Sequence, residues 1–187
     1  CVIVGTADAS TKMNEVLEHI TKESGGDAID VVVATHEHWD HVSGFVQAQQ
    51  AFDKLKFGEI WFAWTESPDD ELANGLRSDR KKRIAALGVA LDRWRTAVAD
   101  AGGDSCDPTG AAAKIATAAS VLGFFGGPAP GDAALGAAPT TKDAMAYLQS
   151  RRERKRYLEP GTSFTLPNIP DVRVYVLGPP RDMSWIK

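Results

Sequence analysis

Three of the chain's four histidines and one aspartate fall within a single stretch of six residues, "HEHWDH". These residues are His36, His38, Asp40 and His41. Imidazole and carboxylate groups are the ligands that suit Zn, Fe, Mn and similar divalent metals. The alternative is a polar, exposed loop whose histidines cap the following helix. So dense a cluster is hard to assign to chance, and we favour a metal site.

The spacing of the four residues bears on how many metals they would bind. On a regular strand, His36, His38 and Asp40 would share one face and His41 would point away. On a tight loop, one pair can instead bind one metal while Asp40 and His41 bind a second. Two metals roughly 3.5–4 Å apart can hold a bridging hydroxide at neutral pH and polarise the bond that it attacks. The pattern therefore indicates hydrolytic chemistry.

The elements around this stretch predict where it lies in the fold. Residues 29–34, "IDVVVA", form a β-branched apolar run typical of a strand buried on both faces. The neighbouring elements are predicted as a strand at 1–5, a helix at 11–24, a helix at 42–53 and a strand at 57–65. This alternation predicts an α/β layered fold with right-handed crossovers. Ligand sites in such sheets gather beyond the carboxyl ends of the strands, where the histidine-rich loop would lie.

The rest of the chain changes in composition and then returns to strand patterning. Apolar residues three and four apart predict an amphipathic helix over 78–99. An Ala-, Gly- and Pro-rich region at 101–139 surrounds one further helical segment. We interpret 66–139 as a helical insertion rather than a second folded domain. The remaining elements are predicted as a helix at 140–156, a strand at 161–166, a turn through "PNIPD" and a strand at 172–177.

The motif and its surroundings resemble the metallo-β-lactamase superfamily of metallohydrolases, whose signature HxHxDH follows a buried strand. Here the motif is preceded by Thr35 and followed by Gly44. The resemblance covers about residues 1–65 and 140–180. It implies a four-layer αββα sandwich, of which this chain would be the N-terminal portion. Residues 1–187 would then form one domain truncated on its C-terminal side, with the insertion at 66–139 inside it.

The resemblance also implies roles for the motif residues. His36 and His38 would bind a first metal, and Asp40 and His41 a second. Asp40 would also be catalytic, because it would help to orient the attacking water. The implied cofactor is a pair of divalent metals, most simply two Zn ions, with Fe or Mn as alternatives. Glu37 occupies a variable position of the motif, as does Trp39, and both are expected to shape the loop or the pocket rim.

The superfamily completes its site with a downstream histidine, a bridging aspartate and a last histidine, and this chain has no histidine after His41. Neither Asp171 nor Asp182 lies in a convincing context for the bridging aspartate, and Asp8 is a weak candidate for an early one. We expect the missing ligands beyond Lys187. The isolated chain would then bind metal weakly and be inactive alone, because two protein ligands per metal fall short of three or four.

Several functions fit these features. The first is a hydrolase acting on an ester, amide, thioester or phosphoester; a redox variant at the same ligands stays open. A nuclease or phosphodiesterase is the alternative substrate class, supported by "RKKR" at 80–83 and "RRERKR" at 151–156. We interpret both clusters as solvated helix faces, and the net charge of −4 argues against wholesale nucleic-acid coating. From a different class, the domain would be a non-catalytic binding or assembly module with a degenerate site.

The remaining features bear on location and packing. No apolar run approaches the roughly 18 residues that a membrane span needs. Cys1 and Cys106 form no disulfide framework, so we expect a reduced, cytoplasmic protein. The chain starts without Met inside a predicted strand, so we expect it to be an excerpt of a longer protein. His19 is expected to be solvated. We predict that Trp61, Phe62 and Trp64 are core residues. The stretch "VLGFFGGPAP" at 121–130 of the insertion fits an active-site lid, a homo-oligomer contact or a packed helix end equally well.

Overall fold

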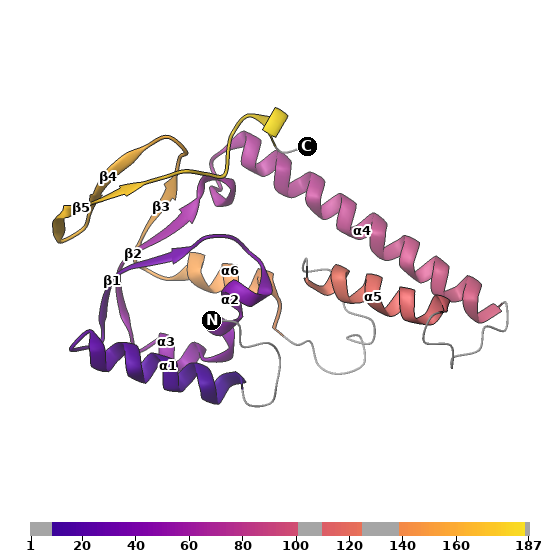
Figure 1. Ribbon diagram of the computed structural model, residues 1–187, viewed down its shortest axis with the longest axis horizontal. Coiled ribbons are helices and arrows are strands. Elements are labelled where there is room, and N and C mark those ends of the chain that lie inside the picture. The colour runs from indigo at the N-terminus through magenta and orange to yellow at the C-terminus, as the bar shows by residue number, and fades with distance from the viewer. Residues whose placement is uncertain (1–8, 101–109, 125–138, 186–187) are drawn as a thin grey trace.

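The computed structural model describes residues 9–100, 110–124 and 139–185, and within them the fold is mixed α/β (Figure 1). Its centre is a parallel sheet in the order β1-β2-β3, formed by Ala28–Ala34, Lys56–Ala63 and Arg154–Leu158. This confirms the predicted α/β class and is consistent with part of the expected αββα sandwich. The predicted strand at 1–5, together with Asp8, Cys1 and Cys106, lies outside the described residues.

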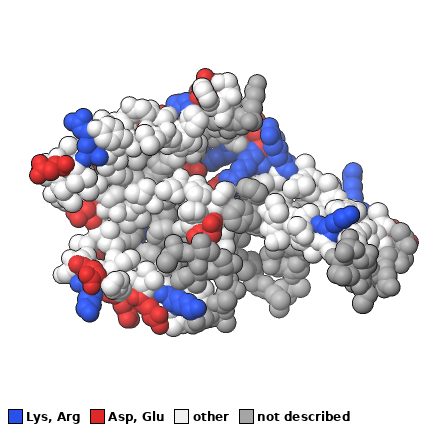
Figure 2. Space-filling model, viewed as in Figure 1, with Lys and Arg blue, Asp and Glu red and all other residues white. Residues whose placement is uncertain are grey.

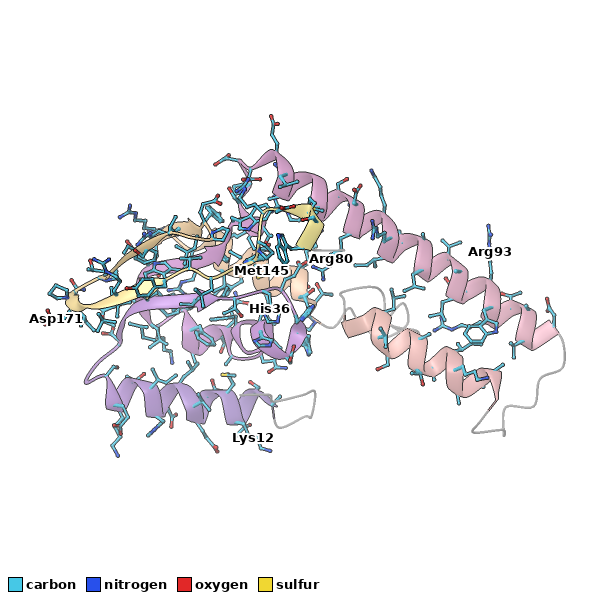
Figure 3. The ribbon with its side chains drawn as sticks, turned by 45° about the horizontal axis from the view of Figure 1, so that its top comes forward. Lys12, His36, Arg80, Arg93, Met145 and Asp171 are labelled. Carbon is cyan, nitrogen blue, oxygen red and sulfur yellow. The ribbon has the colours of Figure 1, made fainter. Side chains whose placement is uncertain are left out.

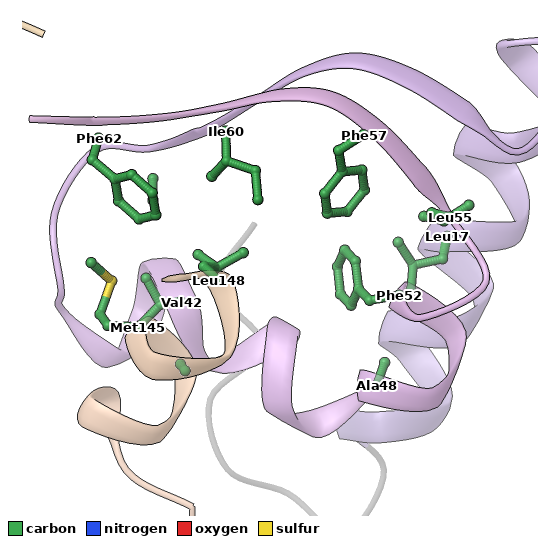
Figure 4. Close-up of a cluster of buried hydrophobic side chains, with 12 residues drawn as sticks. Leu17, Val42, Ala48, Phe52, Leu55, Phe57, Ile60, Phe62, Met145 and Leu148 are labelled. Carbon is green, nitrogen blue, oxygen red and sulfur yellow. The ribbon is translucent and has the colours of Figure 1, made fainter. Parts of the chain in front are cut away.

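One face of the sheet packs against helices to form the main core. The helices on this face are α1 (Ala9–Glu23), α2 (Trp39–Gln47), α3 (Gln49–Phe52) and α6 (Thr141–Ser150). Ile60 and Phe62 of the central strand are buried against Val42 of α2 and Leu148 of α6 (Figure 4). Burying these apolar side chains removes them from water, which is the main driving force for the layer. The core therefore fixes α2, and with it the end of the histidine-rich loop.

The opposite face of the central strand is covered by an antiparallel hairpin. Its strands are β4 (Ser163–Leu166) and β5 (Ile169–Tyr175). The Phe164 ring lies 5.1 Å from the Trp61 ring. The expected turn through "PNIPD" is shorter than predicted, because β5 already begins at Ile169. Asn168 adopts a φ of 61°, a left-handed conformation that asparagine tolerates well in turns.

The predicted core aromatics are confirmed, whereas burial of β1 on both faces is wrong. Trp61, Phe62 and Trp64 are all buried. His19 is exposed on α1, as expected. Val33 of β1 is 52% exposed. β1 is an edge strand of the described sheet, and the described hairpin packs over the central strand instead.

Two helices form an arm beside the sheet and its covering helices. The helical arm consists of α4 (Glu71–Asp100) and α5 (Ala111–Phe124), and Leu91 packs against Leu122 in a small separate core. The helix predicted at 78–99 begins earlier than expected, because the Asp70 carboxylate accepts a hydrogen bond from the Ala73 amide. The boundaries proposed for the domain and its insertion stay predictions.

Two predicted helices that cover the sheet also differ from their expected bounds. The helix expected at 42–53 is divided at Ala48 into α2 and α3. The helix expected at 140–156 ends at Ser150, and residues 154–158 form β3 instead. β3 runs parallel to β2, pairing Arg154 with Glu59 and Leu158 with Ala63. The second basic cluster is therefore not the solvated end of a helix.

Arg151 explains why α6 stops where it does. Its backbone is extended and its side chain is only 10% exposed. The guanidinium donates to the carbonyl oxygens of Phe52 at 3.1 Å and Leu55 at 2.7 Å, and it pairs with Glu153 at 2.6 Å. It also lies over the Phe57 ring at 4.3 Å. These contacts turn the chain away from the helix and into β3.

None of the described helices is long and apolar enough to cross a membrane, which agrees with the sequence prediction for this part of the chain.

Replacing Arg151 with alanine would leave two carbonyl oxygens and the Glu153 carboxylate without their cation. We expect Arg151→Ala to lower the free energy of unfolding by about 3–5 kcal/mol. Arg152→Ala, at the exposed neighbouring position, should change it by no more than about 0.5 kcal/mol. Chemical denaturation of both variants checks this, and equal losses would contradict the role of Arg151.

Gly58 lets β1 and β2 approach closely. A β-carbon at this position would lie 2.5 Å from the Asp30 carbonyl oxygen, which belongs to the backbone of the paired strand. We expect Gly58→Ala to destabilise the protein by about 1–3 kcal/mol. Gly75→Ala in α4 meets nothing within 4 Å and should stabilise by about 0.5–1 kcal/mol. The midpoint of thermal unfolding, Tm, measures both effects. A shift of Tm in the same direction for both variants would refute this prediction.

Candidate metal centre

The four motif residues span the junction between β1 and α2. β1 ends at Ala34 and α2 begins at Trp39, so the connecting loop lies at the carboxyl end of β1, as predicted. His36 and His38 belong to the loop, whereas Asp40 and His41 lie in the first turn of α2. We call residues 35–41 the metal loop; Figure 3 labels His36 within it.

The start of α2 shows that the motif is not explained by helix capping. The His38 backbone is extended, and its carbonyl oxygen accepts hydrogen bonds from the amides of His41 at 3.0 Å and Val42 at 3.1 Å. The His38 side chain makes no capping hydrogen bond to this helix. Backbone groups therefore start α2, and capping gives no reason for the imidazole at this position.

The three imidazole rings of the motif lie together. The His36 ring centroid is 4.6 Å from that of His38, edge to face, and 3.9 Å from that of His41. The Nε2 atom of His41 lies 3.5 Å from Oδ2 of Asp40. The structure therefore brings all four predicted site residues into one cluster, with His36 in contact with both other rings.

The surroundings of His36 favour its neutral form. Burial lowers the pKa of His36, and the neighbouring His41 and His38 lower it further, while Asp40 acts in the opposite direction. A neutral imidazole keeps a lone pair for a metal, whereas an imidazolium has none to give. The Thr35 hydroxyl lies 3.0 Å from Nδ1 of His36 and orients the ring, as outer partners of metal-binding histidines usually do.

The Asp40 carboxylate shows how the cluster fits a cation. Its Oδ1 atom is buried and has no hydrogen-bond partner among the described residues. A buried carboxylate oxygen without a partner is costly, and a bound cation removes that cost. Within the described ranges, no three His, Cys, Asp or Glu side chains are already arranged to hold a metal ion. The donor set fits a divalent metal, although these side chains alone do not form a finished coordination sphere.

Asp171 and Asp182, two other aspartates considered from the sequence, are not part of this cluster. Asp171 lies on the hairpin, at the far end of the molecule from His36 (Figure 3). Hydrogen bonds from the Ser184 side chain and from the Ser184 amide, the latter at 2.8 Å, lower the pKa of the exposed Asp182 carboxyl group. Asp8 falls outside the described residues.

Sequence reasoning missed one contact of the metal loop. Glu37 forms an ion pair with Arg80 of α4, and their side chains are 25% and 35% exposed. The interpretation of Arg80 as part of a solvated helix face is therefore wrong. The sequence carries no signal for this pairing beyond opposite charge, because the two residues come from elements far apart in the chain.

Comparison with known families identifies the superfamily of the chain. A family model described as the metallo-beta-lactamase superfamily matches residues 3–104. The chain belongs to the metallo-β-lactamase superfamily. The matched range contains the metal loop, β1 and β2. Membership agrees with the predicted resemblance, and members of this superfamily are usually hydrolases that bind divalent metals. No curated protein and no solved structure matches the chain.

The cluster predicts that metal content depends on the motif side chains. We expect the full-length protein to bind Zn²⁺, and His38→Ala and Asp40→Ala to lose most of it, because each removes one of few ligands. His19→Ala, an exposed histidine on α1, is the matched control and should keep the wild-type content. Elemental analysis after dialysis measures this. Unchanged metal in both motif variants would refute the site.

Proposed function

We propose that this protein is a metal-dependent hydrolase whose metal loop binds two divalent ions. In this proposal His36 and His38 hold one ion, and Asp40 and His41 hold the other. The observation that carries it is the convergence of three imidazole rings beside a buried Asp40 oxygen that lacks a partner among the described residues. Superfamily membership supports the general chemistry. The substrate would be an ester, amide, thioester or phosphoester.

Each motif side chain has a distinct task in this proposal. Bound metals, two Zn ions or alternatively Fe or Mn, would supply a nucleophilic oxygen at neutral pH and polarise the bond to be cleaved. His36, whose pKa is lowered by burial, stays neutral and available as a ligand. The Asp40 carboxylate would hold an ion through Oδ1, and it would orient the attacking water by accepting a hydrogen bond from it.

The described contacts of the basic residues do not favour a nuclease. Arg154 and Arg156 pair with Glu59 at 3.3 and 3.5 Å, and Arg156 also lies over the Phe164 ring at 4.0 Å. Acidic and basic side chains are interspersed on the face shown in Figure 2. Arg154 is largely exposed, but Arg156 is held between Glu59 and the Phe164 ring and has little left for a phosphate. A small-molecule substrate is therefore the better proposal.

Turnover on a panel of substrate classes tests the proposal. We expect the full-length protein loaded with Zn²⁺ to hydrolyse at least one member of a panel of carboxylic esters, thioesters, amides and phosphodiesters. Asp40→Asn should lower kcat/KM by at least about 100-fold, because the neutral amide binds metal and orients water poorly. Chelation should abolish turnover and added Zn²⁺ should restore it.

Two results would count against this proposal. Hydrolysis that survives both chelation and Asp40→Asn would show that another site is responsible. Metal binding without turnover of any class would favour the binding or assembly module predicted as the alternative.

A further inference from the structure

The ion pair between Glu37 and Arg80 joins the metal loop to the helical arm. Glu37 lies between His36 and His38 in the chain, and Arg80 lies on α4. Figure 3 labels both His36 and Arg80. Both partners of the pair are more than half withdrawn from water, and burial lowers the pKa of Arg80. An ion pair in such surroundings is screened less than a fully exposed one.

The part of α4 that carries Arg80 is itself firmly held. Arg77, one helical turn earlier, donates to the carbonyl oxygens of Thr65 and Ser67, the latter at 2.7 Å. Both carbonyls follow directly after β2, at the same edge of the sheet as the metal loop. The helix that carries Arg80, the partner of Glu37, is therefore itself held in place.

A second set of contacts holds the same end of α4. Arg181 pairs with Asp70, just before α4, at 2.6 Å, and with Glu159 at 2.6 Å. Its guanidinium lies 4.3 Å from the centre of the Trp64 ring, which is buried. The residues after β2 and after β3 thus fix the first turns of α4 beside the end of β1.

We propose that Arg80 is a positioning residue for the metal centre, and that its ion pair with Glu37 sets the orientation of the two flanking imidazoles. Successive side chains of an extended segment point to opposite sides. The His38 backbone is extended and its ring lies 4.6 Å from that of His36, so holding Glu37 toward α4 would direct both imidazoles to the opposite side. The helical arm would then be coupled to metal binding through this contact. This inference rests on the metal site of the proposed function.

Simple electrostatics and positioning make opposite predictions for Arg80. If charge alone mattered, removing the Arg80 cation would strengthen metal binding, because one repulsive charge is lost. Removing the Glu37 anion would weaken it. If the ion pair positions the loop, both changes weaken binding. Once one partner is gone, removing the other should cost nothing further.

A double-mutant cycle on the full-length protein distinguishes the electrostatic explanation from the positioning explanation. Co²⁺ is titrated into Glu37→Gln, Arg80→Gln and the double variant, with visible absorption reporting both affinity and coordination geometry. We expect each single variant to weaken Co²⁺ binding by about 10–100-fold and to alter the absorption bands, as loss of outer partners does elsewhere. The double variant should be no weaker than the weaker single variant.

Control variants keep the result independent of folding. Lys82→Gln breaks an exposed ion pair with Asp79 on the same helix and should leave Co²⁺ affinity within about twofold. Arg80→Lys keeps the cation without the guanidinium fork and should retain more affinity than Arg80→Gln. Thermal unfolding of each chelator-treated variant checks that the fold is intact.

The outcomes distinguish this inference from the proposed function. Arg80→Gln binding Co²⁺ as tightly as wild type, or more tightly, overturns the positioning role while leaving the metal site intact. Losses in the two single variants that simply add in the double variant overturn the positioning role as well. A wild-type protein that binds no Co²⁺ overturns the proposed metal site and this inference together.

Discussion

Arg151 joins the two turns from which β2 and β3 begin, and the alignment of the sheet depends on it. Its guanidinium donates hydrogen bonds to the carbonyl oxygens of Phe52 and Leu55 and to the carboxylate of Glu153. Tyr147 completes the cluster: its hydroxyl accepts from Arg151 and donates to Asp53, and burial raises its pKa to about 12. Because a buried cation is tolerated only when its donors are used, this cluster fixes where α6 ends and β3 starts.

The amino ends and the carboxyl ends of the parallel strands differ in the polar contacts they make. At the amino ends of β2 and β3, the Arg151 guanidinium donates to backbone carbonyl oxygens. At the carboxyl edge, β1 leads into the metal loop, while the turn after β2 receives Arg77. The polar side chains at this end include those of the motif, that of Arg80, which pairs with Glu37, and that of Arg77. Parallel sheets generally bind ligands beyond the carboxyl ends of their strands, and the metal loop lies at that end.

Local features could be predicted from the sequence and long-range pairings could not. The motif was readable because its four side chains fall within six residues, directly after a β-branched run. β3 was missed because the charges of "RRERKR" look like a solvated helix end. Their partners, Glu59 and the Phe52 and Leu55 carbonyls, come from elements far away in the chain. The Glu37–Arg80 pair was hidden for the same reason.

The crowding of the imidazoles explains why the loop must be held from outside. Rings with centroids as close as 3.9 Å repel one another if two are protonated, which agrees with the lowered pKa of His36. Neutral rings at this distance gain little from one another, so their contacts alone do not determine where their nitrogens point. The metal binding that we propose is demanding in its geometry, because Zn–N bonds of about 2.0–2.1 Å would require those lone pairs to converge on one position. β1 and α2 anchor the loop at its two ends, and within it the Thr35 hydroxyl lies beside Nδ1 of His36. Glu37, the residue between His36 and His38, adds an ion pair from this loop to Arg80 of α4.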